Sequence, residues 1–179
     1  MSLYYVACFP NLSEADSWIS DFRVNHDPKA SRVGLHMTFV FPTKALSECQ
    51  LVTELNEIGR NTKKFAVHCR SALAMPEKDA ALGLVSSVFL VPDEGFGEAV
   101  RLHSRLYANS LQSELRLDVP FIPHLTIGSS IEMGLAKREV DKLNSNRFRF
   151  SFEVENLTIV KVTDVGAVRQ VVQTVALSL

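Results

Sequence analysis

Two short segments of this 179-residue sequence share one pattern, a histidine followed two positions later by a threonine inside an apolar run. The first, VGLHMTFVFP, contains His36 and Thr38, and the second, VPFIPHLTIG, contains His124 and Thr126. The apolar, partly β-branched and aromatic composition of both runs predicts strands. Since residues i and i+2 of a strand share one face, each histidine is expected beside its threonine on an open face. The apolar neighbours then point the other way, into a helix layer.

The same order of elements surrounds both segments, which lie about half the chain apart. In the first half we expect a strand at 3–9, a helix at 13–24, the first His-x-Thr strand, a helix at 47–59 and a strand at 64–73. In the second half we expect a strand at 81–91, a helix at 96–112, the second His-x-Thr strand and a helix at 132–144, with closing strands at 147–162 and 167–179. This repeat predicts an internal duplication.

The duplication implies an α+β, bilobal fold in which two antiparallel or mixed sheets, with helices packed outside them, face a central groove. The length fits one such domain, residues 1–179. Within it, Ser47 and Gln50 match a capping box for the second helix, and Gly59 is expected to end that helix.

Charge and composition limit the kinds of partner. With 19 basic and 20 acidic residues the formal net charge is -1, which argues against a protein that covers many phosphates of double-stranded DNA. A single phosphate in a local pocket remains compatible. No apolar run approaches the ~20 residues of a membrane span. Three cysteines without a metal-binding spacing are expected to be reduced core thiols. We therefore expect a cytoplasmic monomer without membrane attachment.

Two imidazoles and two hydroxyls converging in a groove suit attack on a phosphodiester or cyclic phosphate without a metal or another cofactor. With an ordinary pKa of about 6.5, one neutral histidine can remove a proton from the nucleophile while the other, protonated, donates to the leaving oxygen. The threonine hydroxyls can donate to phosphate oxygens, where negative charge builds up. The sequence leaves open which histidine is the acid and which is the base.

The alternative is a pair of structural histidines, and it is disfavoured because both motifs fall in strands at matching places. The other three histidines are expected to be non-catalytic, with His103 in the core. No metal-binding motif is present in the sequence. Candidates for stacking on a base are the aromatic residues Tyr4, Tyr5, Phe41 and Phe121. Lys29 and Arg32 are loop charges that we expect to be solvated, with contact to a phosphate tail as the alternative.

The segments HMTF at 36–39 and PHLTIG at 123–128 resemble the paired signatures of the two-histidine (2H) phosphoesterase superfamily. Within it the whole chain is most similar to the LigT-like 2′-5′ RNA ligase family. The resemblance implies a hydrolase for 2′,3′-cyclic phosphate ends of nucleotides or RNA, with water attack that leaves a 2′-phosphate. By motif, it implies His36 and His124 as the acid/base pair and Thr38 and Thr126 as the phosphate-binding hydroxyls. Alternatives are a 2′-5′ oligonucleotide phosphodiesterase, a 2′-5′ RNA ligase or a non-catalytic protein that binds nucleotides or RNA ends.

Overall fold

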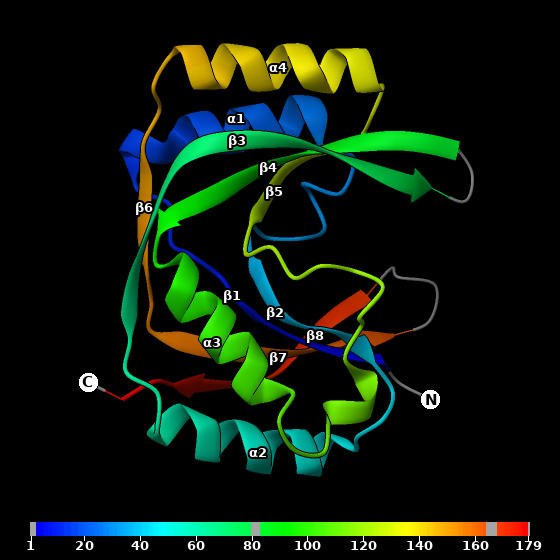
Figure 1. Cartoon of the computed structure of the whole chain (residues 1–179), viewed down its shortest axis with the longest axis vertical. Helices are drawn as coiled ribbons and strands as arrows, with labels where there is room; N and C mark the ends of the chain where they lie inside the picture. Colours follow the sequence, from blue (N-terminus) through cyan, green and yellow to red (C-terminus); the bar gives the residue numbers. More distant parts are fainter. Residues whose placement is uncertain (1–2, 80–82, 164–167, 179) are drawn as a thin grey trace.

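Two four-stranded sheets form the framework of the computed structural model, which describes residues 3–79, 83–163 and 168–178 (Figure 1). The lower sheet has the order β2 (Met37–Thr43), β1 (Leu3–Cys8), β7 (Asn156–Thr163) and β8 (Val168–Ala176). The upper sheet has the order β5 (Leu125–Ile131), β4 (Gly83–Glu94), β3 (Phe65–Asp79) and β6 (Phe150–Val154). Neighbouring strands are antiparallel in both sheets, which confirms the predicted two-sheet α+β fold.

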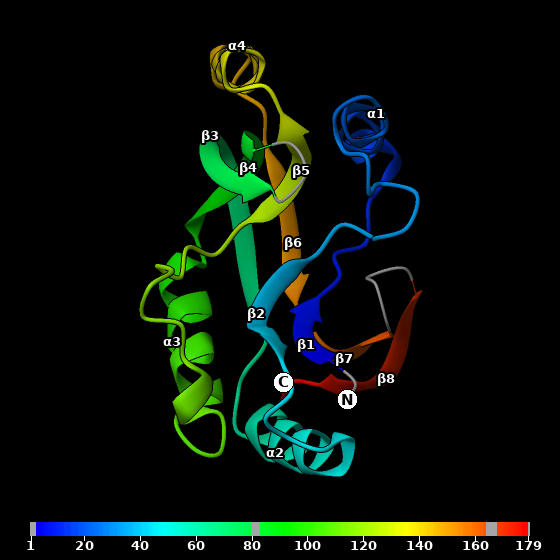
Figure 2. The same cartoon turned by 90° about the vertical axis from the view of Figure 1, so that its right-hand side faces the viewer.

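Two of the four α-helices are exchanged between the halves of the chain. The helices are α1 (Ser17–His26), α2 (Glu48–Arg60), α3 (Phe96–Leu106) and α4 (Met133–Ser145), with short 3-10 turns η1 (Glu14–Asp16) and η2 (Gln112–Glu114). Helix α2 packs on β7 and β8, and α4 packs on β3 and β4. Helix α1, from the first half, packs on β5 of the upper sheet, whereas α3, from the second half, packs on β2 of the lower sheet (Figure 2).

Several predicted boundaries differ from the structure, among them those of the helix expected at 13–24, which is η1 followed by α1, and of the strand expected at 64–73, which continues to Asp79 as β3. The expected strand at 147–162 is two strands, because the chain leaves the upper sheet after β6 and enters the lower sheet as β7, with Glu155 between them. The helix predicted at 96–112 ends at Leu106, and irregular turns follow. Both His-x-Thr strands begin later than predicted, one residue after the histidine. A run of apolar residues marks burial, and it does not mark where the ladder of hydrogen bonds starts.

Helix α2 begins as predicted and ends differently. The Ser47 hydroxyl accepts from the Gln50 N–H at 3.4 Å while the Gln50 side chain accepts from the Ser47 N–H at 3.0 Å, so the capping box is confirmed. Gly59 lies inside the helix instead of ending it. A Cβ at this position would lie 2.7 Å from Cγ1 of Val175 and 3.0 Å from the carbonyl oxygen of Ala176. The glycine therefore lets α2 approach β8.

One buried cluster continues through both sheets and includes Met37 and Phe39 from β2 and Leu125 and Ile127 from β5. These side chains are fully buried, as predicted from their alternation with the histidine and threonine positions. Cys8 and Cys69 are core thiols, and burial raises the pKa of each to about 12. Cys49, by contrast, is exposed on α2, so the prediction of three core thiols is wrong for this residue. Across the described ranges, no helix combines the length and apolar character needed to cross a membrane.

Candidate functional site

The two His-x-Thr motifs occupy corresponding positions in the two sheets. Each histidine is the last residue before its strand, and each threonine is the second residue of that strand. Thr38 pairs with Ala7 on β1, and Thr126 pairs with Phe89 on β4. The histidine and threonine side chains are half-buried while their immediate neighbours are buried. The prediction that each pair shares the less buried face of its strand is confirmed.

Both imidazoles are held by the same local hydrogen bond, to a carbonyl two residues earlier. The Nδ1 atom of His36 lies 2.8 Å from the Gly34 carbonyl oxygen, and the Nδ1 atom of His124 lies 2.6 Å from that of Ile122. Because a carbonyl oxygen only accepts, Nδ1 must carry the proton in both rings. The protonation state of each ring then changes at Nε2. This arrangement fixes the tautomer that general acid/base chemistry at Nε2 requires.

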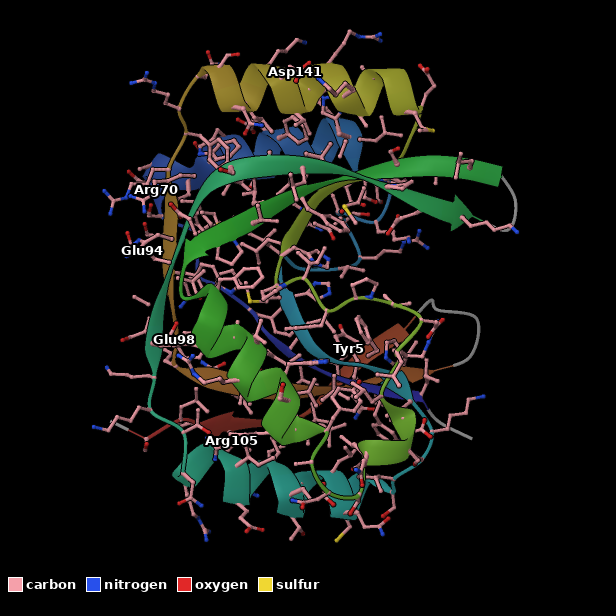
Figure 3. All side chains as sticks on the ribbon, in the orientation of Figure 1. Tyr5, Arg70, Glu94, Glu98, Arg105 and Asp141 are labelled. Carbon is pink, nitrogen blue, oxygen red and sulfur yellow. The ribbon has the colours of Figure 1, made fainter. Side chains whose placement is uncertain are left out.

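The surroundings of the two rings differ. His36 lies against Tyr5 of the lower sheet (labelled in Figure 3) and Phe9, with ring centroids 5.8 and 5.5 Å away. His124 stacks on Phe89 with a centroid distance of 3.7 Å and an interplanar angle of 14°. Burial lowers the pKa of His124 from its ordinary value, while the bond to the Ile122 carbonyl and the charge of Glu77 partly oppose that shift. The surroundings of His124 therefore favour its neutral form.

Three of the four predicted site residues, His36, Thr126 and His124, line two cavities. A cavity of about 190 Å³, here called the polar cavity, is lined by residues that include Arg23, Asp27, Lys29, His36, Glu77, Ser87, Thr126 and Ser129. A cavity of about 390 Å³, here called the apolar cavity, is lined by residues that include Phe41, Met75, Pro76, Glu77, Phe89, Asp118, Val119, Ile122 and His124. Glu77 lines both cavities and accepts a hydrogen bond of 2.6 Å from the Ser87 hydroxyl. Thr38 lies on the same strand face as His36 but lines neither of these two cavities.

A buried ionic network underlies the polar cavity, and it was not predicted from the sequence. Arg23, on α1, donates to Asp27 through Nη2 at 2.9 Å and Nε at 3.3 Å, and through Nη2 to the Val33 carbonyl at 2.6 Å. Asp27 also accepts from the Lys29 backbone N–H at 3.0 Å and from the Ser129 hydroxyl at 2.8 Å. Burial alone would raise the pKa of Asp27, but these hydrogen bonds and the charge of Arg23 hold it below its usual value. The one available sequence signal was the spacing of Arg23 and Asp27, four apart, as for an ion pair on a helix.

The remaining predicted candidates have separate environments. Tyr4 lies in the core and donates to Glu48 at 3.2 Å, and Phe121 stacks on His103 at 3.7 Å. His103 is buried, with Nδ1 2.8 Å from the Phe39 carbonyl oxygen, which confirms it as a core histidine. The base-stacking candidates thus reduce to Phe41, which lines the apolar cavity, because Tyr5, beside His36, is buried as well.

Charged residues elsewhere form pairs of their own. Arg70 on β3 bonds Asp93 at 2.5 Å and Glu94 at 2.6 Å, at the end of β4, where Figure 3 labels Arg70 and Glu94. Of the two loop cations, Lys29 lines the polar cavity, whereas Arg32 is exposed and lines neither cavity. Among the described residues, no three His, Cys, Asp or Glu side chains gather as metal ligands would.

The fold matches solved structures along nearly its whole length. Escherichia coli LigT in complex with 3′-AMP superposes with a TM-score of 0.63 at 17% identity, covering 99% of each chain. TT0787 of Thermus thermophilus gives a TM-score of 0.61 at 17% identity, covering 99% of this chain and 98% of the other. Usb1 of Kluyveromyces marxianus gives 0.53 at 11% identity, covering 98% of each chain. At these identities the likeness shows the fold.

The sequence itself supplies the family. No protein with a curated description matches it. The sequence profile of the 2′-5′ RNA ligase superfamily, however, matches residues 10–166, a segment that holds both His-x-Thr motifs. This chain therefore belongs to the 2′-5′ RNA ligase superfamily.

Proposed function

We propose that the protein is a metal-independent phosphoesterase that hydrolyses 2′,3′-cyclic phosphate ends of nucleotides or RNA through His36 and His124. One observation carries the proposal: two histidines at matching positions, each with Nδ1 anchored to a backbone carbonyl, lie at two cavities that share Glu77. Paired imidazoles in one fixed tautomer can remove one proton and supply another during attack on phosphorus. The hydroxyl of Thr126, in the polar cavity, is assigned to a non-bridging phosphate oxygen, and the same role for Thr38, which lines neither cavity, rests on its motif alone.

A nucleotide substrate fits the character of the two cavities. The apolar cavity, next to His124, has aromatic and aliphatic walls suited to a base and ribose, with the carboxylates of Glu77 and Asp118 on its lining. The polar cavity, with His36 and Thr126, suits the phosphate side. Structures of the similar LigT protein hold 3′-AMP, ATP or NADP+, which supports nucleotide binding in this fold.

The test is hydrolysis of nucleoside 2′,3′-cyclic phosphates in EDTA by the natural protein, His36→Ala and His124→Ala. Each single substitution should lower kcat by about 10²–10⁴-fold, because each removes one proton-transfer group. His68→Ala is the matched control, since His68 bonds Ser151 and lines neither cavity. Full turnover in either cavity variant would refute the paired-histidine reaction. Nucleotide binding without turnover would instead indicate a binding protein.

A second activity, cleavage of a linear 2′-5′ phosphodiester, is favoured by the neutral state of His124 beside the apolar cavity. With the nucleoside in that cavity, His124 would take the proton from the ribose 3′-hydroxyl as its oxygen bonds to phosphorus. The bond to the leaving 5′-oxygen then breaks, and His36 protonates that oxygen, so the product is a 2′,3′-cyclic phosphate. Hydrolysis of the cyclic product needs the reverse roles, with His124 as the acid and His36 as the base for water.

The two activities should share one form of pH dependence. Each needs one protonated and one neutral histidine, and the ratio of the two singly protonated forms of the pair does not change with pH, so kcat/KM for both should follow the same bell-shaped profile. Profiles for a cyclic nucleotide and a 2′-5′ dinucleotide, measured from about pH 5 to about pH 9, provide the comparison. Profiles with different limbs would contradict a histidine pair shared by the two reactions.

A further inference from the structure

We propose that Arg23 is an additional substrate-binding residue, which donates from Nη1 to an oxygen of the phosphate in the polar cavity. This inference rests on the proposed function and names the cation of that site. Arg23 comes from α1, far in sequence from the second motif, yet it lines the same cavity as His36 and Thr126. The distribution of its guanidinium hydrogen bonds leaves donors for a ligand.

A guanidinium carries five N–H donors, and three of those on Arg23 have partners. The Nε–H and one Nη2–H point to Oδ2 of Asp27, and the other Nη2–H points to the Val33 carbonyl oxygen. Within residues 3–79, 83–163 and 168–178, no acceptor takes either proton of Nη1. The residue is only 8% exposed, so these two donors belong to a buried cation at a cavity wall. Buried donors in native proteins are normally satisfied. Arg23 lines the polar cavity and also a second cavity of about 360 Å³, and we take the contents of the polar cavity, which holds His36 and Thr126, as the acceptor for Nη1.

The chemistry of the wall favours an anion with several oxygens. Thr126 and Ser87 bring hydroxyls to the same cavity, Lys29 is a second cation on its lining, and His36 adds a third when it is protonated. Glu77 and Asp27 are the carboxylates on this wall, and both already accept hydrogen bonds, from Ser87 and from Arg23 respectively. A phosphate oxygen matches a guanidinium N–H in charge and in geometry, and charge-assisted bonds of this kind are stronger than neutral ones.

The same residue also positions the two motifs. Through Val33, Arg23 holds the loop three residues before His36, and through Asp27 and Ser129 it is linked to β5 three residues after Thr126. Binding at Nη1 would therefore take place at a group already fixed by both halves of the site. Such preorganisation lowers the cost of ordering a side chain around the anion.

The test is binding of inorganic phosphate and of a nucleoside 2′-monophosphate, measured by calorimetry and by amide shifts of Thr126. Asp27→Asn keeps the Arg23 cation and should bind phosphate at least as tightly as the natural protein. The double variant Arg23→Gln/Asp27→Asn keeps a neutral hydrogen-bonded pair of similar shape. It should bind phosphate at least about tenfold more weakly than Asp27→Asn. The matched control is Arg32→Gln, a loop arginine that lines neither cavity and should leave Kd unchanged.

Equal affinities of the folded double variant and Asp27→Asn would overturn the proposal, as would a natural protein that binds neither probe. Should the double variant not fold, Arg23→Lys replaces it, since lysine keeps the charge beside Asp27 but lacks Nη1. Undiminished phosphate affinity in a folded Arg23→Lys protein would then overturn the proposal. Turnover is not the readout, so a protein that binds phosphate through Arg23 without hydrolysing a cyclic nucleotide would refute the proposed function alone.

Discussion

The two site histidines have the same backbone anchor but different neighbours. At the scale of single residues, NMR titration can measure how those neighbours affect the pKa of His124. His124 is closed in by Phe89, with Glu77 as the nearby charge that counters the effect of burial on its pKa. Glu77→Gln should therefore lower the pKa of His124 further, because a carboxylate favours the imidazolium. NMR titration of the ring protons measures the shift. Glu94→Gln is the control, because the Glu94 carboxylate pairs with Arg70 at the end of β4. This substitution should leave the pKa of His124 unchanged.

His103 and His124 also make stability depend on pH. Burial lowers the pKa of both His103 and His124 in the folded protein, so between the folded and unfolded pKa values the unfolded chain binds more protons. The free energy of unfolding is therefore highest above about pH 6.5, where these histidines are neutral in both states. It falls as the pH drops below that value. Urea unfolding at about pH 7 and pH 5 checks this.

His103→Asn is the informative variant for that pH dependence. Its side-chain amide can replace the Nδ1–H that bonds the Phe39 carbonyl, but it does not titrate. The loss of stability between the two pH values should therefore be smaller than in the natural protein. An equal loss would show that His103 does not contribute to it.

Much of the residue-level site could be predicted from the sequence, and the rest depends on three-dimensional neighbours. His36 and Thr126 line one cavity and His124 lines the neighbouring one, while the expected meeting of all four side chains in one groove and their catalytic and binding roles stay predictions. Arg23, Glu77 and Ser129 reach the polar cavity from α1, β3 and β5. Such a long-range meeting of single polar residues leaves no periodic signal in a sequence.

At the scale of elements, the glycines of two helices give a matched pair of substitutions. Gly59→Ala in α2 would place a methyl group against Val175 and the Ala176 backbone, so it should destabilise the protein by about 1–3 kcal/mol despite the better helix propensity of alanine. Gly97→Ala in α3 would meet only the flexible end of Arg101, at 3.2 Å, and should be neutral or stabilising by up to about 1 kcal/mol. Thermal unfolding of both variants tests the comparison. A destabilised Gly97→Ala beside an unaffected Gly59→Ala would contradict it.

Element types were more predictable than element limits. The capping box of α2 is a local interaction, so its sequence pattern placed the start of that helix correctly. The division of 147–162 into β6 and β7 depends on which sheet each strand joins. Both strands carry the same kind of apolar residues, and therefore composition alone could not separate them.

At the scale of the whole molecule, the shared core predicts cooperative unfolding. Since one buried cluster runs through both sheets, the two lobes should unfold together as the single domain expected for residues 1–179. Trp18, the one tryptophan, packs on Phe148 at 5.5 Å near the upper sheet and gives a local fluorescence signal. Its urea transition should coincide with that of far-UV circular dichroism, which reports on both sheets. Separate midpoints would show that the lobes are independent.

The exchange of α1 and α3 between the sheets has a consequence for the independence of the two halves. Each half of the chain leaves its first helix on the other half, and β3 joins the upper sheet after α2 has packed on the lower one. This is the architecture of a domain-swapped dimer contained in one polypeptide. Neither half could therefore fully cover its own motif strand if the chain were cut between them, because β2 is packed by α3 of the second half and β5 by α1 of the first.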